Sequence, residues 1–236
     1  MLVHLCCVVA KMLRHIKKYD VKCLTGDGAG GNMATAIALK LRDDKFEPAI
    51  KMQVLISPFV QALDMQLPSY VRYQDGPFVT RSMIAFVLAN YLEGNGEKFQ
   101  AYINNDHVSP AVKKMKVPYV DVTQLPSKYL VGYEKPSVEI GNETIFNELK
   151  GKLLNPYFSP LFARLDGLPV TYLFTAEHDA LRDDGFLYAY KLNKSGVKVE
   201  HVHSDISVHG SLVNFCTLPE VDEMYRGVAK FITQNL

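Results

Sequence analysis

The chain carries an aspartate and a histidine at places where an acid–base pair could form. Asp179 lies in segment 176–185, directly after an apolar run, and His209 lies in segment 207–210, directly after another. Functional groups gather at the carboxyl ends of strands in open α/β sheets, so the two side chains are expected to meet there. A carboxylate that orients an imidazole makes it a general base. Taken singly, Asp179 could instead cap a helix and His209 could be an ordinary turn residue.

A general base needs a nucleophile, and a glycine-rich turn stands where one would be expected. Residues 26–32 are Gly-Asp-Gly-Ala-Gly-Gly-Asn. Their spacing matches Gly-x-Ser-x-Gly, the nucleophile elbow, in which a tight strand-to-helix turn lifts a serine hydroxyl above the sheet. Gly28 occupies the serine's position and has no side chain. The segment therefore predicts an elbow in form without its nucleophile, and the alternative is a glycine-rich turn unrelated to catalysis.

No neighbouring side chain is expected to replace the serine. Thr25 lies within a predicted strand, Ser57 ends a different one, and Asp27 should point elsewhere because successive side chains diverge on a tight turn. Acyl transfer tolerates little misplacement of the attacking atom. The turn also strains a non-glycine residue at its centre by about 1–3 kcal/mol, so Gly28 relaxes the elbow while it removes the chemistry.

The elements that must position these residues follow from apolar periodicity. Short apolar runs predict buried strands at 21–25, 52–57, 170–175 and 197–202. Apolar stripes with capping residues predict helices at 33–41, 80–92, 183–196 and 221–232. Such alternation of strands and helices argues for a mostly parallel sheet with helices on both faces.

The stretch 59–168 interrupts this rhythm with proline, glycine and tyrosine. An insertion of this size in an α/β domain is usually a cap over the site or a set of surface excursions, and caps tend to contact the ligand. We therefore expect residues 1–236 to form a single partial α/β domain, with 59–168 as a helical, cap-like insertion within it.

Composition excludes several classes of function. With 26 Lys plus Arg against 25 Asp plus Glu, the formal charge of +1 creates no field that would attract nucleic acid. The four cysteines show no C-x-x-C spacing and no nearby histidine set, so no metal site is expected. The sequons at Asn142 and Asn193 would permit N-glycosylation in a secretory lumen.

The amino-terminal run 1–10 is apolar apart from His4. It is far shorter than the ~20 residues that span a bilayer, and no basic segment precedes it. We therefore expect neither a transmembrane segment nor a signal peptide in this chain. Residues 2–18 place apolar and basic positions on opposite sides, which predicts an amphipathic helix packed on the following strand; a membrane-surface helix is the alternative.

Taken together, segments 26–32, 179–185 and 209–210 resemble the three signatures of the hormone-sensitive-lipase branch of the α/β-hydrolase fold, and above all the arylacetamide deacetylase-like proteins. Segments 167–172 and 192–197 add to the match, and the order elbow, Asp, His is that of α/β hydrolases. Such proteins begin with a membrane-anchoring helix, four more strands and a His-Gly-Gly-Gly loop. The resemblance therefore implies that this chain is the C-terminal part of an α/β-hydrolase fold, truncated at its amino terminus.

The resemblance also implies roles for individual residues. Asp179 would orient and charge-stabilise His209, and His209 would act as general base toward a serine at position 28. The backbone amide of Ala29 would be one oxyanion donor, and no cofactor is implied. Loss of a triad nucleophile costs roughly a million-fold in turnover. Each lost oxyanion donor removes about 2.7–4 kcal/mol of transition-state stabilisation.

Three functional hypotheses follow. We favour a carboxylic-ester hydrolase family member of the Ser-Asp-His type, inactive or vestigial in this chain because of Gly28 and the absent oxyanion loop. The second is a non-catalytic ligand-binding pseudoenzyme, and the third is an unstable truncated isoform whose cut sheet exposes an apolar edge. The expected partner is a small apolar ester or lipid-like ligand. The resemblance implies the endoplasmic reticulum membrane or lumen, with membrane contact expected only of full-length relatives.

Overall fold

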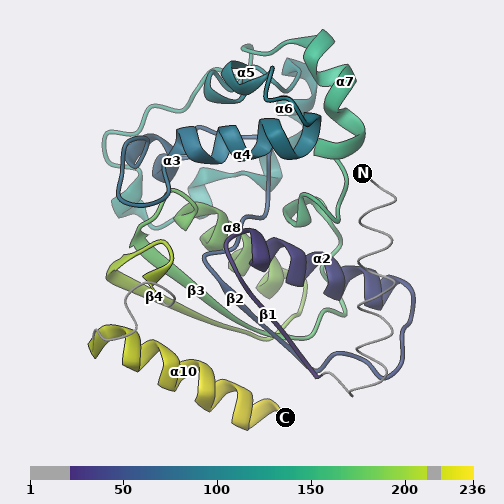
Figure 1. The fold of residues 1–236 in the computed structure, drawn as a ribbon, viewed down its shortest axis with the longest axis vertical. Coiled ribbons are helices and arrows are strands. Elements are labelled where there is room, and N and C mark those ends of the chain that lie inside the picture. The colour runs from purple at the N-terminus through teal and green to yellow at the C-terminus, as the bar shows by residue number, and fades with distance from the viewer. Residues whose placement is uncertain (1–21, 212–218) are drawn as a thin grey trace.

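The computed structural model describes residues 22–211 and 219–236, and a four-stranded sheet lies at its centre (Figure 1). The strands are β1 (Cys23–Asp27), β2 (Met52–Ile56), β3 (Val170–His178) and β4 (Val199–Val208). They are hydrogen-bonded in the order β1-β2-β3-β4, and every neighbouring pair is parallel. All four carboxyl ends therefore meet at one edge, which is where a site is expected in this type of sheet.

Side chains of the sheet alternate between two cores because successive strand residues point to opposite faces. Leu55 and Leu173 face the larger core, which α2 (Ala29–Asp43) and α8 (Arg182–Lys194) cover. Met52, Val54 and Phe174 are among the residues that face the smaller core, under α10 (Pro219–Asn235). Figure 1 shows α2 and α8 on one face of the sheet and α10 on the other. The predicted parallel sheet flanked by helices is confirmed.

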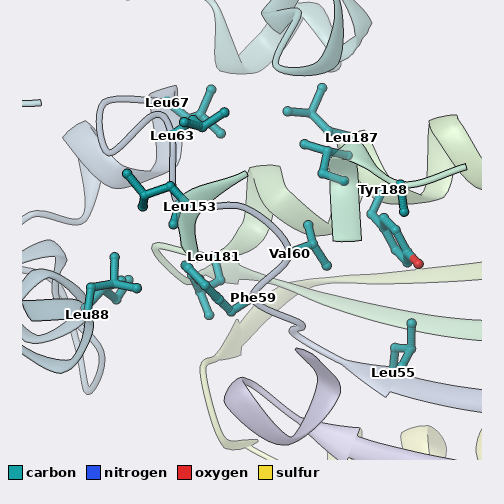
Figure 2. Close-up of a cluster of buried hydrophobic side chains, with 14 of the residues drawn as sticks. Leu55, Phe59, Val60, Leu63, Leu67, Leu88, Leu153, Leu181, Leu187 and Tyr188 are labelled. Carbon is teal, nitrogen blue, oxygen red and sulfur yellow. The ribbon is translucent and has the colours of Figure 1, made fainter. Parts of the chain in front are cut away.

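Between β2 and β3 the chain forms only helices and loops. The helices of this stretch are α3 (Pro68–Arg72), α4 (Arg81–Glu93), α5 (Phe99–Ile103), α6 (Pro110–Lys116), α7 (Glu143–Leu153), η1 (Val117–Tyr119), η2 (Val122–Gln124), η3 (Ser127–Tyr129) and η4 (Pro160–Phe162). Figure 1 shows α3 to α7 beyond α2 and α8, away from α10. Leu63, Leu88 and Leu153 from this stretch share one buried cluster with Leu55 and Leu181 (Figure 2). The helices between β2 and β3 therefore pack on the sheet layer without a separate core.

Local signals set most of the helix ends. Thr80 caps α4 by accepting a hydrogen bond from the Met83 amide, and Gly94 ends it with a φ of 87°. Left-handed glycine is the usual stop for a helix because it has no Cβ to strain. Gly196, with a φ of 77°, lies two residues beyond the end of α8. The structure thus confirms the predicted helix at 80–92 almost to the residue.

The structure differs from the expected elements at the ends of two strands. β3 and β4 continue to His178 and Val208, beyond the predicted ends at 175 and 202, and their register shifts between Ala176 and His178. These ends are polar and irregular, so hydrophobic alternation does not reveal them. The predicted helix at 2–18 lies outside the described residues. Within the described part of the chain, no helix is both long and apolar enough to cross a bilayer.

Buried charges tie the helices between β2 and β3 to α8. Asp184 accepts hydrogen bonds from the Val60 amide at 3.1 Å and from Gln61 Nε2 at 3.1 Å. Asp183 accepts from the Ser69 amide at 2.7 Å. Both carboxylates lie in the first turn of α8, as expected for residues that complement the helix dipole, but they are fully buried. A buried carboxylate is costly without hydrogen-bond partners, so these bonds are needed in the folded state. They hold the first residues of the inserted stretch against the start of α8.

Candidate active site

The turn between β1 and α2 has the geometry of a strand-to-helix elbow. Gly28, with φ 53° and ψ −114°, is the single residue between Asp27 at the end of β1 and Ala29 at the start of α2. L side chains rarely adopt a positive φ, so glycine meets this requirement at the lowest cost. A Cβ on Gly31 would lie 2.9 Å from Pro58 Cβ. Glycine at position 31 therefore allows the turn to pack closely against Pro58.

Asp179 and His209 form the hydrogen-bonded pair that their sequence positions predicted. His209 Nδ1 donates to Asp179 Oδ2 at 2.9 Å. The second oxygen of the buried Asp179 carboxylate accepts from the Leu181 amide at 2.8 Å, which holds the carboxylate in place. Ser211 Oγ bonds both backbone groups of Val208 and so stabilises the turn that carries the imidazole. The neutral ring is thereby fixed with its proton on Nδ1 and its lone pair on Nε2.

The free side of the imidazole faces Gly28. A Cβ built on Gly28 would lie 3.0 Å from His209 Nε2 and 3.2 Å from Cε1. The ring therefore stands directly over the elbow, close enough that any added side chain would displace it by a few tenths of an ångström. Ala29 is the first residue of α2, where helix amides have no intrahelical acceptor. The structure brings Gly28, Ala29, Asp179 and His209 to one place.

Asp27 lies closer to the imidazole than the sequence argument predicted. Its Oδ1 atom is 3.9 Å from His209 Nε2. This oxygen is buried without a hydrogen-bond partner in the described part of the chain. Asp27 does not point away from the site, because the imidazole comes from the loop after β4 and lies over both Asp27 and Gly28. Thr25 remains within β1 and Ser57 is buried after β2, and neither lines the cavity described below.

The charges around the imidazole change its acidity. Burial alone would lower the pKa of His209. The hydrogen bond and charge of Asp179, together with the charge of Asp27, outweigh burial and raise this pKa above the ordinary value of 6.5. Burial also raises the pKa of the Asp27 carboxyl, which the charge on His209 partly opposes. Two carboxylates thus hold one imidazole in a state that favours a positive charge.

A cavity of about 260 Å³ opens beside the elbow. Its walls are almost entirely apolar, and they come from the elbow, α4 and the loops around it. The lining residues are Gly28, Ala29, Asn32, Met33, Phe59, Val79, Met83, Ile84, Val87, Leu88, Tyr91, Phe158, Leu181 and His209. The rings of Tyr91 and Phe158 stack with their centroids 5.7 Å apart. An apolar wall that carries an imidazole, here that of His209, is typical of a site for a small ligand.

Asn32, the last residue of the glycine-rich segment, was not assigned a role from the sequence. Its Nδ2 donates to the carbonyl oxygens of Phe59 at 2.9 Å and Phe158 at 2.8 Å. One buried amide therefore joins α2 to two aromatic residues of the cavity wall. No local signal could have revealed this, because Phe158 is 126 residues away along the chain.

A second polar cluster lies at the ends of β3 and β4. Glu177, His203 and Asp205 place possible metal ligands within 4.8 Å of one another. Lys128 Nζ already pairs with Asp205 at 2.9 Å, and Tyr129 OH donates to Glu177 Oε2 at 2.7 Å. These residues do not line the cavity. The cluster is thus an ion-pair network that anchors Lys128 and Tyr129 to the sheet.

Comparisons with known proteins agree with the fold and with the motifs. A family described as the alpha/beta hydrolase fold matches residues 6–135 and 107–213. Neutral cholesterol ester hydrolase 1 of Pongo abelii is 35% identical over 209 residues, which cover 84% of this chain and 51% of that protein. Arylacetamide deacetylase-like 2 of Homo sapiens is 34% identical over 213 residues, covering 86% of this chain and 52% of that protein. The chain spans about half the length of these curated relatives.

Solved structures point the same way. A hyperthermophilic esterase from the archaeon Pyrobaculum calidifontis is similar with a TM-score of 0.57 and 26% identity, over 90% of this chain and 52% of that one. The esterase of Pseudomonas putida ECU1011 is similar with a TM-score of 0.60 and 25% identity, over 93% and 54%. The resemblance inferred from the motifs is confirmed: the chain belongs to the α/β-hydrolase fold family, in the branch of arylacetamide deacetylase and neutral cholesterol ester hydrolase.

Proposed function

We propose that this chain is a carboxylic-ester hydrolase homologue that keeps the ester-binding cavity and the base, and whose serine-type hydrolysis is absent or vestigial. The observation that carries this proposal is the position of Gly28, whose Cβ would lie 3.0 Å from His209 Nε2. In a Ser-Asp-His mechanism the base takes its proton from a hydroxyl at this point. Glycine leaves the base without a hydroxyl to activate.

The neighbouring groups take the remaining roles. Asp179 orients the ring through its 2.9 Å hydrogen bond and stabilises the imidazolium. The Ala29 amide at the start of α2 is an oxyanion donor. No step of this chemistry needs a cofactor or a metal ion.

The cavity supports a small apolar ester or a lipid-like ligand. Its volume of about 260 Å³ is close to the lower end of ligand pockets, and its walls carry few polar groups. We propose that residues 59–168 act as the cap over it, because α4 and Phe158 supply one wall. The names of two relatives, neutral cholesterol ester hydrolase and arylacetamide deacetylase, describe ester and amide substrates. A cavity of this volume would accept a small ester or the acyl part of a larger one.

The same cavity favours a second function, non-catalytic binding. The Tyr91 and Phe158 rings stack, Asn32 fixes the backbone of Phe158, and this aromatic wall does not depend on a nucleophile. Rigid aromatic surfaces bind apolar ligands at low entropic cost. A ligand that binds the folded state of the chain and not its unfolded state would raise the melting temperature.

The test is to restore the hydroxyl with Gly28→Ser in the 236-residue chain and to measure hydrolysis of ethyl butyrate, with Gly28→Ala as the matched control. We expect turnover only in the serine variant, because it alone offers His209 a hydroxyl. The rate should be low, because the Ala29 amide is the one oxyanion donor identified in the described part of the chain. The alanine variant carries the same backbone strain and lacks the hydroxyl. Thermal melting of all three proteins shows whether each folds cooperatively, which also tests the unstable-isoform hypothesis. A cooperatively folded serine variant that leaves the ester intact would contradict the assignment of position 28.

A further inference from the structure

We propose that His209 Nε2 is itself an acyl acceptor for aryl esters, so that the chain hydrolyses them slowly through an acyl-imidazole without any serine. This inference rests on the proposed function, because it uses the same cavity and the same base. It gives the site a reaction of its own, which differs from that of a serine hydrolase in the attacking atom, the intermediate and the range of esters.

The first support is the orientation of the imidazole. Nδ1 is committed to Asp179 by the 2.9 Å hydrogen bond, so the lone pair of the neutral ring lies on Nε2. Nε2 faces Gly28, and the histidine lines the cavity. A serine hydroxyl at position 28 would lie between Nε2 and a bound ester. With glycine there, Nε2 is the nucleophilic atom that the described residues present to the carbonyl carbon.

The second support is the charge around Nε2. Attack by Nε2 converts the ring to an N-acylimidazolium, which carries a positive charge. Asp179 faces the ring from the loop after β3, and Asp27 faces it from the end of β1 with Oδ1 3.9 Å from Nε2. Two carboxylates stabilise this cation, and Asp27 Oδ1 has no hydrogen-bond partner in the described part of the chain. The oxyanion that forms on the other side lies toward the amide of Ala29, at the positive end of α2.

The reaction balances with the ester and one water. The Nε2 lone pair forms a bond to the carbonyl carbon, the carbon–oxygen bond to the aryl group breaks, and the aryloxide leaves with the electron pair. The Nδ1 proton is then released. Water adds to the acyl carbon, the bond to Nε2 breaks, and the carboxylic acid departs as the imidazole regains its proton. Alkyl esters do not react, because an alkoxide is a far poorer leaving group than imidazole and the first adduct reverts.

The first experiment compares p-nitrophenyl butyrate with ethyl butyrate as substrates of the 236-residue chain. We expect saturable release of p-nitrophenolate and no hydrolysis of the alkyl ester. His209→Gln should lower the aryl-ester rate by about a hundredfold, the lower end of what a positioned imidazole contributes. His178→Gln is the matched control, because His178 ends β3 outside the cavity, and it should leave the rate unchanged. Equal rates in the two variants would overturn the proposal.

The second experiment uses the unaltered chain, so it does not depend on whether a variant folds. Rapid denaturation at neutral pH during turnover, followed at once by mass spectrometry, should show one acyl group on the peptide that contains His209. Hydroxylamine should capture the acyl group as a hydroxamate, and the first release of p-nitrophenolate, which reports acylation, should have nearly the same rate in D2O. A marked slowing in D2O without an acylated peptide would show that His209 activates water directly, and it would contradict nucleophilic attack.

Failure of this inference is distinguishable from failure of the proposed function. Butyrophenone, a ketone that cannot be hydrolysed, reports on the cavity alone. If it raises the melting temperature while aryl esters are not turned over through His209, the acyl-imidazole route is wrong and the ester-binding site stands. If it has no effect on melting and the esters are untouched, both are wrong.

Discussion

Replacement of Gly28 by alanine tests the elbow geometry through stability. Gly28 has a φ of 53°, and a non-glycine residue held in such a conformation costs about 1–3 kcal/mol. The new methyl group would also lie 3.0 Å from His209 Nε2, which requires the ring to move. We therefore expect Gly28→Ala to lower the free energy of unfolding by about 1–3 kcal/mol, a large part of the 5–15 kcal/mol typical of a domain.

Gly30→Ala is a matched control within the same motif. A Cβ on Gly30 would meet nothing within 4 Å, and Gly30 is helical in α2. Alanine in a helix is favoured over glycine by about 0.5–1 kcal/mol, so this variant should be as stable as the parent or slightly more stable. The two substitutions add the same methyl group two residues apart, and we expect them to change the free energy of unfolding in opposite directions.

The assay is urea unfolding followed by circular dichroism, with the slope m compared among variants so that a change in midpoint reports stability. His209→Ala in the Gly28→Ala background separates the two contributions, because it removes the ring contact and leaves the backbone strain. A Gly28→Ala variant as stable as Gly30→Ala would refute the positive-φ elbow. Full recovery in the double variant would assign the whole cost to the ring contact and none to the backbone.

Three further predictions concern charge and the cavity. In Gly28→Ser, the rate of ester hydrolysis should rise with pH with a midpoint above 6.5, because the base works only when neutral and the pKa of His209 is raised. Adding Asp179→Asn should lower that midpoint and reduce the rate by up to about 10⁴-fold. Rate–pH profiles of the two variants measure both effects. Burial raises the pKa of Asp184 to about 7, so the folded state binds an extra proton between about pH 4 and pH 7. This carboxyl therefore makes the free energy of unfolding fall as pH rises through that window. Asp184→Asn should flatten the dependence of this free energy on pH, measured by urea unfolding from pH 5 to 8. Tyr91→Ala should remove most of the rise in melting temperature caused by butyrophenone, since Tyr91 stacks on Phe158 in the cavity wall, and an undiminished rise would place the ligand elsewhere.

Local signals in the sequence predicted most of the fold. The apolar runs of β2 and β3 are buried along nearly their whole length, so hydrophobicity alone locates them. Thr80 and Gly94 stand where a helix cap and a helix stop are needed, and the ends of α4 follow from them. The glycine-rich turn was visible because a tight elbow tolerates few other residues.

Contacts between distant segments were not predictable in the same way. Asp184 bonds to Gln61, 123 residues earlier in the chain, and nothing in the first turn of α8 indicates that partner. The same holds for Asn32 and Phe158. The short distance between Asp27 and the imidazole depends on where the loop after β4 places His209. The arrangement of the whole sheet determines that placement.

The central claim is that Gly28 stands where a hydroxyl would be activated by His209 and Asp179, and covalent labelling of Gly28→Ser by a fluorophosphonate tests it most directly. Such a probe reacts with a serine whose hydroxyl is deprotonated by a neighbouring base. We predict labelling near one probe per chain, located at position 28 by peptide mass spectrometry. No labelling is expected in Gly28→Ala, and greatly slowed labelling is expected when Asp179→Asn is added. A folded Gly28→Ser protein that stays unlabelled, or one labelled at another residue, would contradict the account.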